Sequence, residues 1–268
     1  MAQKYFEGVA HANLYAKFRP SPPQNLGNEI ISYLKKKYTG DLNLCLDVGC
    51  GNGQSSNLFS PYFQKVIATD ASPAQVEVAK TMNHPPNINF LVGVAEELPV
   101  KDGSVQLVTA SQACHWFDLA TFFEETKRVL CPGGIVALSG YTFPKFLHPT
   151  KANDLQRAFD LLYYERTGSF WGKGRELVDN EYFDIILPFK DFTREEFWTK
   201  PITTTMSEFV GYITTWSGFQ NYCKVHGSNA GEEILEEFTS SCRKACENYE
   251  ENAQLLITRK YFLLMGRV

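Results

Sequence analysis

Short apolar runs alternate with stretches of helical periodicity through the first half of the chain. Apolar runs cover residues 42–46, 65–69, 88–92, 105–110 and 135–138, and each is bounded by turn residues. Apolar side chains recur at helical spacing in residues 24–38, 73–82 and 119–130, and a further helix is predicted to begin at Gln54. Strands that alternate with helices in this rhythm predict a parallel sheet with helices on both faces.

The pattern changes after residue 140. Aromatic residues crowd residues 141–190, where an amphipathic helix is predicted at 155–166. A strand is then predicted over 192–206, a helix capped by Ser207, a second helix over 231–249 and a closing strand over 255–265. We expect the helices to form a lid around the end of the sheet.

The first 23 residues are predicted to be irregular. They end in Phe18-Arg19-Pro20-Ser21-Pro22-Pro23, and prolines at this density exclude a helix where they occur. This segment is either a stiff lead-in to the next helix or a cover for the binding site.

Composition excludes several classes of function. The 268 residues are 44% hydrophobic and 21% charged, as in an ordinary soluble domain, and the net charge of −4 provides no footprint for nucleic acid or an anionic membrane. No run reaches the ~18 apolar residues of a membrane span, and no signal peptide is recognisable. The seven cysteines are scattered, which suits a reducing compartment. We therefore expect a cytoplasmic monomer that acts on a small molecule.

No metal site is predicted. The five histidines show no ligand spacing. Cys242 and Cys246 share a helix face, but they continue an apolar stripe, so core packing is favoured over metal binding.

The glycine-rich turn after the first apolar run carries the first chemical signal. Asp47-Val48-Gly49-Cys50-Gly51-Asn52-Gly53 has the spacing G-x-G-x-G, whereas the dinucleotide fingerprint is G-x-G-x-x-G. Asp47 at the strand end has the wrong sign for a pyrophosphate but suits a cofactor with an amino group. The turn therefore points to S-adenosylmethionine, and a Rossmann dehydrogenase is a distant alternative.

A second acid strengthens that interpretation. Asp70 ends the next apolar run, 21 residues after Gly49, and a carboxylate at this spacing can accept both hydroxyls of a ribose. The segments DVGCGNG, ATDAS, AEELP, CHWF and RVLCPGG then follow in order. In these segments the chain resembles the class I S-adenosylmethionine-dependent methyltransferases. FRPSPP, CHWFD, WGKGR and the final GRV are more narrowly similar to the trans-aconitate methyltransferase group (methyltransferase type 11).

The resemblance implies a fold and a division of the chain. It implies an α/β fold, a doubly wound seven-stranded Rossmann-like sheet with an aromatic-rich helical lid, whose closing strand is antiparallel to the strand at 192–206. The whole chain, 1–268, would be one methyltransferase domain. Residues 40–140 would form the cofactor-binding core, and residues 141–190 and 207–250 the lid and acceptor-binding elements.

The resemblance also implies a set of site residues. The implied S-adenosylmethionine-binding residues are Phe18, Arg19, Asp47, Gly49, Cys50, Gly51, Asp70, Ala71, Ser72, Ala95, Glu96 and Ser111. The implied catalytic residues are His115, Trp116 and Arg175. One departure concerns adenine: Val94 stands where the superfamily often has an aspartate, so backbone groups or Glu96 would hold that ring.

The acceptor is expected to be a carboxylate. Arg175 lies between glycines and aromatics in Trp171-Gly172-Lys173-Gly174-Arg175, and a guanidinium grips a carboxylate with two parallel bonds. His115 is either a base or part of the pocket wall, and a carboxylate acceptor needs no base. Trp116 either packs against the sulfonium or fills the core. The alternatives are an amine, phenol, lipid or macromolecular acceptor, and a catalytically silent S-adenosylmethionine-binding protein.

Overall fold

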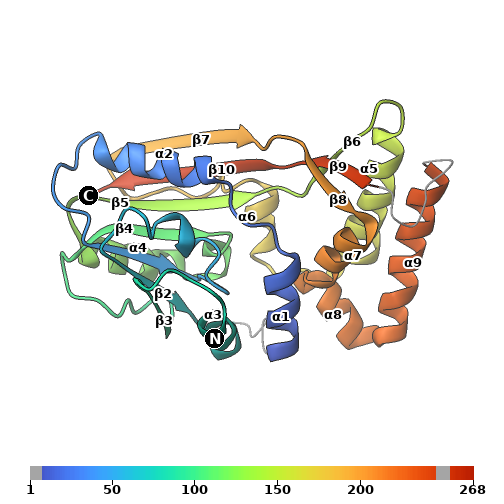
Figure 1. Cartoon of the computed structure of the whole chain (residues 1–268), viewed down its shortest axis with the longest axis horizontal. Helices are drawn as coiled ribbons and strands as arrows, with labels where there is room; N and C mark the ends of the chain where they lie inside the picture. Colours follow the sequence, from blue (N-terminus) through green and yellow to red (C-terminus); the bar gives the residue numbers. More distant parts are fainter. Residues whose placement is uncertain (1–7, 246–253) are drawn as a thin grey trace.

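A seven-stranded mixed sheet organises the molecule (Figure 1). The computed structural model describes residues 8–245 and 254–268. Within them the strand order is β3-β2-β1-β4-β5-β10-β7, parallel from β3 to β5, with β10 antiparallel to both its neighbours. The strands are β1 (Leu44–Val48), β2 (Lys65–Asp70), β3 (Ile88–Val92), β4 (Val105–Ser111), β5 (Leu130–Tyr141), β7 (Asp191–Trp198) and β10 (Lys260–Arg267). The predicted sheet and its antiparallel closing strand are confirmed.

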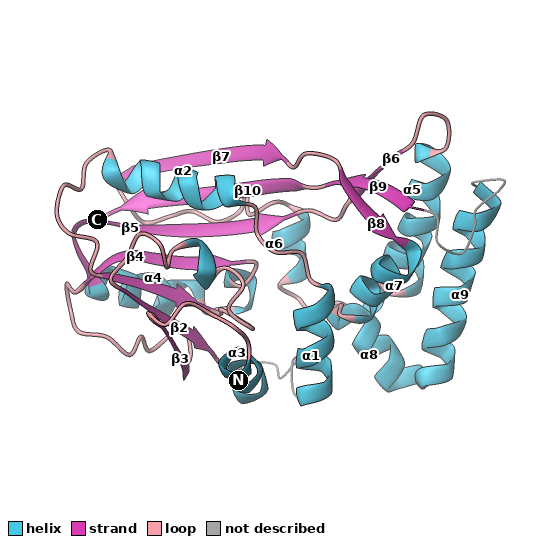
Figure 2. Ribbon diagram, in the orientation of Figure 1, coloured by secondary structure: helices cyan, strands magenta, loops and turns pink. Residues whose placement is uncertain are grey.

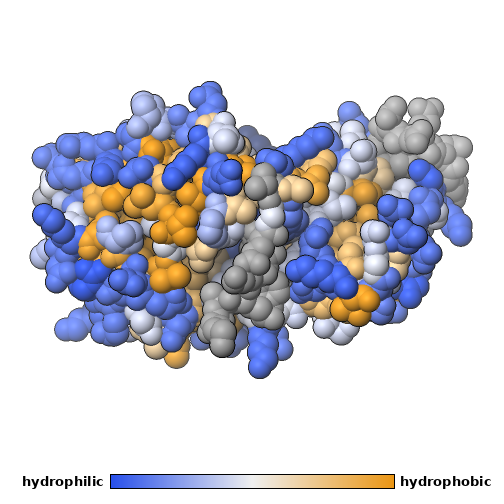
Figure 3. Space-filling view, turned by 90° about the horizontal axis from the view of Figure 1, so that it is seen from below, coloured by the Kyte–Doolittle hydropathy of each residue, from blue (hydrophilic) through white to orange (hydrophobic). Residues whose placement is uncertain are grey.

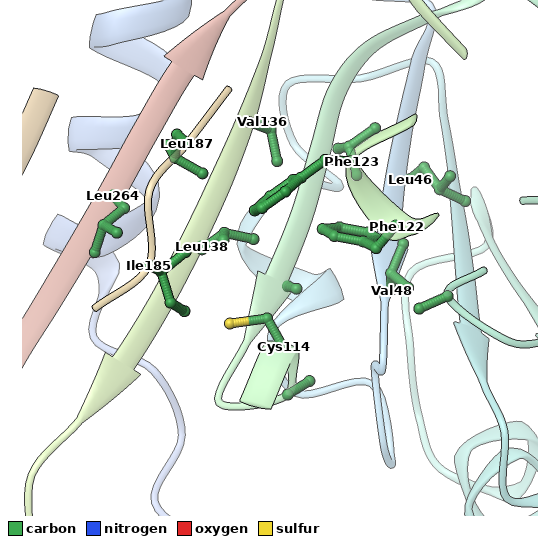
Figure 4. Packing of buried hydrophobic residues seen from close by; sticks show 14 of the residues in the cluster. Leu46, Val48, Cys114, Phe122, Phe123, Val136, Leu138, Ile185, Leu187 and Leu264 are labelled. Carbon is green, nitrogen blue, oxygen red and sulfur yellow. The ribbon is translucent and has the colours of Figure 1, made fainter. Parts of the chain in front are cut away.

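Helices on both faces bury alternate side chains of the strands. Val136 and Leu138 of β5 pack in the same core as α4 (Leu119–Val129), whereas Ile135 and Ala137 pack in the core of α2 (Gln24–Lys35). Figure 4 shows the first of these cores, where phenylalanines of α4 lie among aliphatic side chains of the sheet. Burial on both faces explains why the parallel strands β1, β2 and β4 are almost continuous apolar runs.

Two predicted helix starts on the core are confirmed. α3 (Pro73–Thr81) begins after Ser72, whose hydroxyl accepts a hydrogen bond from the Gln75 N–H, and α4 begins after Asp118, which accepts from two backbone N–H groups. Such capping oxygens satisfy donors that the first helical turn leaves unpaired.

The helix predicted from Gln54 is a single 3₁₀ turn, Ser56–Leu58. The Ser55 and Ser56 hydroxyls both donate to Asp47 Oδ2, at 2.7 and 2.6 Å. Serines whose side chains bond elsewhere in this way favour turns over helices.

The prediction that residues 1–23 are irregular is wrong for α1 (Val9–Phe18). The prolines stop this helix without preventing it, and residues 1–7 lie outside the described part. α1 lies between the sheet and the helical part (Figure 2) and contacts both α3 and α7 (Met206–Thr214). Phe18 packs over Gly211 of α7, where an added Cβ would lie 2.5 Å from the phenylalanine ring. Contacts with α3 and α7 therefore stabilise α1, although the sequence pattern of residues 1–23 does not predict a helix.

The part of the chain beyond the large sheet, which we call the lid, contains helices and a small sheet. The helices are α5 (Ala152–Asp160) continued by a π-helical turn (Leu161–Arg166), α6 (Arg175–Asp179), α7, α8 (Ser217–His226) and α9 (Ser228–Ala245). All of these except α6 enclose a third core rich in aromatic rings, whereas Val178 of α6 packs in the first core. Figure 3 shows the sheet part and the helical part side by side, each with apolar residues in view and hydrophilic ones around the margin. Cys242 is buried in this third core, whereas Cys246 lies outside the described residues.

Two predicted strands are each divided between the two sheets. The strand predicted over 192–206 becomes β7 and β8 (Ile202–Thr205), and the closing strand becomes β9 (Gln254–Thr258) and β10. β6 (Lys145–Leu147), β9 and β8 form the small antiparallel sheet. Pro201 has no N–H to donate, which favours a break in the ladder there. Thr205, not Ser207, caps α7, in a capping box with Glu208.

Arg267 ties the closing strand to α2. Its buried guanidinium donates to the carbonyls of Tyr33 and Leu34 at the end of α2, to the Gly133 carbonyl and to the Asp191 carboxylate. One side chain thus satisfies three backbone acceptors from two segments. None of the helices in the described residues has both the length and the apolar character needed to cross a bilayer.

We predict that Arg267→Ala lowers the free energy of unfolding by about 3 kcal/mol, because the Tyr33 and Gly133 carbonyls lose this donor and Asp191 keeps only Lys37 as a cationic partner. Urea denaturation measures the change. Arg157→Ala is the control and should have little effect, since the Arg157 side chain is 79% exposed. Equal midpoints for the two variants would contradict this role of Arg267.

Candidate active site

The glycine-rich turn lies at the carboxyl edge of the sheet, where the strand order reverses between β1 and β4. This switch point is where open α/β sheets bind ligands. Gly49 and Gly51 have φ angles of +70° and +54°, which L side chains rarely adopt. A Cβ on Gly49 would lie 2.5 Å from that of Ala113. Around Gly51 the nearest atoms, from Tyr15 and Gln75, would be 3.9 Å from such a Cβ, which is ordinary van der Waals contact without a clash.

Asp47 is fully buried beneath the turn. Its Oδ2 accepts from both serine hydroxyls, whereas Oδ1 has no partner among the described residues. Burial raises the pKa of Asp47 to about 6, against the lowering effect of the two hydroxyls. A buried carboxylate oxygen without a donor is costly unless a ligand supplies one.

Asp70 is held by the turns on either side of it. Its Oδ2 accepts from the Gly51 N–H and its Oδ1 from the Ser72 N–H, both at 2.8 Å. Burial raises the pKa of this carboxyl, and the two backbone donors lower it. Ala71 is exposed beside it. The Cys50 side chain points into a small core under α3, so only its backbone is available at the turn.

The segments after β3 and β4 complete this side of the site. Ala95 is buried in the core, and Val94 is 41% exposed. Glu96 Oε1 accepts from the Asp118 N–H at 2.8 Å, so one carboxylate oxygen already bonds within the fold. Ser111 is half-buried at the end of β4.

A cavity of about 40 Å³ lies between this edge and the lid. Aromatic rings from both parts line it, together with Arg19, Gln112, His115, Arg175 and Ser217. The aromatic residues are Tyr15, Trp116, Tyr141, Phe143, Trp171, Tyr212 and Trp216. The cavity is therefore a small aromatic enclosure with two guanidinium groups in its wall.

Arg19 enters the cavity wall from the end of α1. Its Nε donates to the Thr215 hydroxyl at 2.8 Å, Nη2 to the Thr215 carbonyl at 3.0 Å, and Nη1 to the Tyr141 hydroxyl at 3.2 Å. The guanidinium also lies over the Tyr15 and Tyr212 rings, 4.8 and 5.4 Å from their centroids. No acidic side chain in residues 8–245 and 254–268 pairs with it. Phe18 points away, into the lid core.

Arg175 enters the same cavity from the start of α6. Its Nε donates to the Tyr163 hydroxyl at 2.7 Å, and Nε and Nη2 donate to Asp179 Oδ1 at 2.8 and 2.6 Å. The guanidinium stacks 4.3 Å from the Phe143 centroid. Nη1 has no hydrogen-bond partner in the described part of the chain. Arg175 is thus only partly neutralised, and one nitrogen is left for another ligand.

His115 and Trp116 lie in a 3₁₀ turn, Cys114–Trp116, between the two parts. Their rings are in contact, with centroids 4.7 Å apart and the planes tilted by 47°. His115 Nδ1 lies 3.0 Å from the hydroxyl of the buried Tyr182. Burial, followed by Arg175 and Arg19, lowers the pKa of His115 to about 3. The imidazole is therefore neutral at physiological pH and a poor base.

Several residues of the site went unnoticed in the sequence. Tyr15 lies on a helix that the pattern did not predict. Gln112, at φ +52°, bonds both the N–H and the carbonyl of Tyr141 through its side-chain amide. Asp179, at the end of α6, and Tyr182, in the turn after it, belong to no recognisable sequence motif. Among the described residues, no group of three or more His, Cys, Asp or Glu side chains is placed to hold a metal ion.

The comparisons with known proteins agree with this geometry. Residues 46–138 match the family described as a methyltransferase domain. A Dictyostelium discoideum protein named as a methyltransferase is 31% identical over 243 residues, which cover 90% of this chain and 87% of the relative. A Saccharomyces cerevisiae protein named as an S-adenosylmethionine-dependent methyltransferase is 24% identical over 98% of this chain and 96% of its own. A solved structure from Anaeromyxobacter dehalogenans, described as a type II methyltransferase, has a TM-score of 0.76 at 27% identity and covers 93% of this chain and 98% of its own.

We predict that Gly174→Ala lowers the free energy of unfolding by about 1–3 kcal/mol. A Cβ at Gly174 would lie 2.0 Å from the His115 carbonyl oxygen, so the loop before α6 would have to move off the 3₁₀ turn. Gly168→Ala is the matched control, because its nearest neighbour would be an ordinary 3.7 Å away. Urea denaturation that gave the same loss for both variants would contradict this close approach.

Proposed function

Because the chain belongs to the class I S-adenosylmethionine-dependent methyltransferases, we propose that it transfers a methyl group from that cofactor to a carboxylate oxygen of a small molecule. The cofactor follows from the family. The acceptor is our inference from the charges around the aromatic cavity.

The residues at the sheet edge fit the cofactor. S-adenosylmethionine supplies a methyl group activated by a sulfonium, and it also carries an ammonium and two ribose hydroxyls. Asp47 Oδ1 is buried with no donor among the described residues, which suits the ammonium. We assign the ribose to Asp70, because each of its oxygens keeps lone pairs beyond the one backbone bond it accepts. Gly49 and Gly51 let the backbone approach a ligand that a Cβ would keep away.

The observation that carries the acceptor proposal is Arg19. Arg19 is half-buried and has no acidic partner among the described residues, so an anionic ligand in the cavity would offset the cost of removing this charge from water. Arg175 faces the same cavity with Nη1 free of hydrogen bonds in the described residues. Two guanidinium groups and aromatic walls suit a small, planar anion such as an unsaturated di- or tricarboxylate.

A carboxylate acceptor is also consistent with the absence of a strong base among the described cavity residues. A carboxylic acid with a pKa near ~4 is ionised at neutral pH, so no proton has to be removed before transfer. The chain then has to align the acceptor and exclude water, which can supply about 7–11 kcal/mol. The enclosing lid and the two arginines suit that task.

The proposal is tested by incubating the purified chain with methyl-labelled S-adenosylmethionine and a panel of acceptors. The panel contains mono-, di- and tricarboxylates including trans-aconitate, with amines and phenols for contrast. We expect a methyl ester of a di- or tricarboxylate. Methylation confined to an amine or phenol would refute the carboxylate assignment, and no transfer at all would favour a silent binding protein.

We predict that the affinity for S-adenosylmethionine is constant above about pH 7 and falls about tenfold per pH unit below pH 6. The pKa of Asp47 is raised to about 6, so its carboxylate is charged above that pH and becomes protonated as the pH falls through it. Calorimetry across this range measures the effect. Asp47→Asn should bind at least about tenfold more weakly, without the acid limb. Asp41→Asn, at an exposed acid, should keep it.

We predict that Arg19→Lys and Arg175→Lys each raise the KM of the carboxylate at least about tenfold, because a single ammonium cannot keep the bonds of the guanidinium within the fold and also reach the acceptor. The dissociation constant of S-adenosylmethionine should stay the same in Arg175→Lys. Lys173→Ala is the control, since Lys173 is exposed two residues away. An unchanged KM in Arg175→Lys would remove that residue from the acceptor site.

A further inference from the structure

His115 is held by contacts to its ring and to its backbone. The ring Nδ1 lies 3.0 Å from the Tyr182 hydroxyl, the ring packs at a tilt of 47° against Trp116, and the backbone carbonyl lies against Gly174. Because His115 lines the cavity while Nδ1 is occupied, Nε2 is the nitrogen left for a ligand. Nε2 has no hydrogen-bond partner within the described residues.

The core of the protein holds Tyr182 in place beside His115. Its side chain is fully buried, and it and Glu181 have φ angles of +60° and +52°. Two successive non-glycine residues in the left-handed region are rare and mark a constrained site. The ring packs edge-on against Phe262 of β10, with centroids 4.9 Å apart. Core packing therefore fixes the direction of the hydroxyl.

The acceptor strengths of the neighbouring groups determine which of them accepts the hydrogen bond of the Tyr182 hydroxyl. The Tyr182 hydroxyl interacts with two groups, His115 Nδ1 and the thiol of Cys114. An imidazole nitrogen is a strong acceptor and a thiol sulfur a weak one, so the hydroxyl proton goes to Nδ1. The thiol stays protonated, because burial raises the pKa of Cys114 to about 12, so it carries no charge that would draw the hydroxyl proton away from Nδ1.

We propose that Tyr182 is a positioning residue that holds His115 in the Nε2–H tautomer, so that His115 offers the methyl acceptor a neutral hydrogen-bond donor. The proposal rests on the proposed function for the identity of the acceptor. Arg19 and Arg175 supply the positive charges that face the ring, and no acidic side chain is among the cavity-lining residues. The Nε2–H would bond one carboxylate oxygen and leave the other for methylation.

The fixed tautomer of His115 would determine which class of methyl acceptor the site selects. A carboxylate only accepts hydrogen bonds, so two guanidinium groups and one imidazole N–H match it. An amine or phenol has to lose a proton, and a nitrogen that already carries one cannot take it. By keeping Nε2 protonated, Tyr182 therefore disfavours methylation of acceptors that need a base.

Nitrogen NMR of histidine-labelled protein tests the tautomer without any acceptor. The five histidines are resolved by sequence-specific variants, with His115→Gln assigning the ring in question. From about pH 5.5 to 8.5 we expect an uncharged Nε2–H ring. An Nδ1–H ring, or protonation of this ring within that range, would overturn the proposal.

Tyr182→Phe keeps the aromatic ring and removes the hydroxyl. We expect the His115 signals to become those of a mixture of tautomers, whereas Tyr164→Phe, at a tyrosine that is 66% exposed, should leave them unchanged. Thermal denaturation and binding of S-adenosylhomocysteine check that both variants are folded. A pure Nε2–H ring in folded Tyr182→Phe would show that Tyr182 does not set the tautomer.

The donor role is tested by adding trans-aconitate to the parent protein saturated with S-adenosylhomocysteine. The His115 Nε2 signal should shift while the signals of the exposed His148 and His226 stay in place. If trans-aconitate binds, as judged by calorimetry, and the signal does not shift, the donor role is wrong. Failure of the acceptor panel would refute the carboxylate acceptor and with it the donor role, but it would leave the tautomer measurement unaffected.

Discussion

The buried carboxylate of Asp47 is the constraint on which the site depends. It ends the central parallel strand at full burial, where an unpaired oxygen is expensive. Ser55 and Ser56 turn back to satisfy its other oxygen, and this prevents a regular helix after the glycine turn. The turn then lies between the ends of β1 and β2. Satisfying one acid thus shapes the turn that we assign to the cofactor.

Acidic and basic side chains lie in different places around the site. Two acids, Asp47 and Asp70, lie on the side of the sheet edge. Two guanidinium groups, from Arg19 and Arg175, lie on the side of the lid. A cationic donor and an anionic acceptor would therefore each meet opposite charge, with the neutral His115 between them. This polarity is the physical basis for our choice of acceptor.

The lid depends on close backbone approaches made possible by glycines. Phe18 of α1 packs on Gly211, Trp171 packs on Gly218, and the His115 carbonyl packs on Gly174. These contacts join the first helix, the loop before α6 and the lid helices around one aromatic cavity. Its volume of about 40 Å³ is too small for a tricarboxylate, so we expect the lid to move when the acceptor enters.

The sequence by itself determined the sheet, because apolar runs and acid-ended strands are local patterns with a fixed period. It also indicated Asp47, Gly49, Gly51 and Asp70, since a G-x-G-x-G turn with an acid after each of two strands has few structural solutions. It placed Arg175 in the lid but did not reveal Asp179 and Tyr163, which hold it. Only the tertiary structure decided that residues 9–18 form a helix, that Arg19 lacks an acidic partner among the described residues, and that Tyr182 meets His115. Those facts depend on segments 67 to 196 residues apart, and no local pattern encodes a contact at that separation.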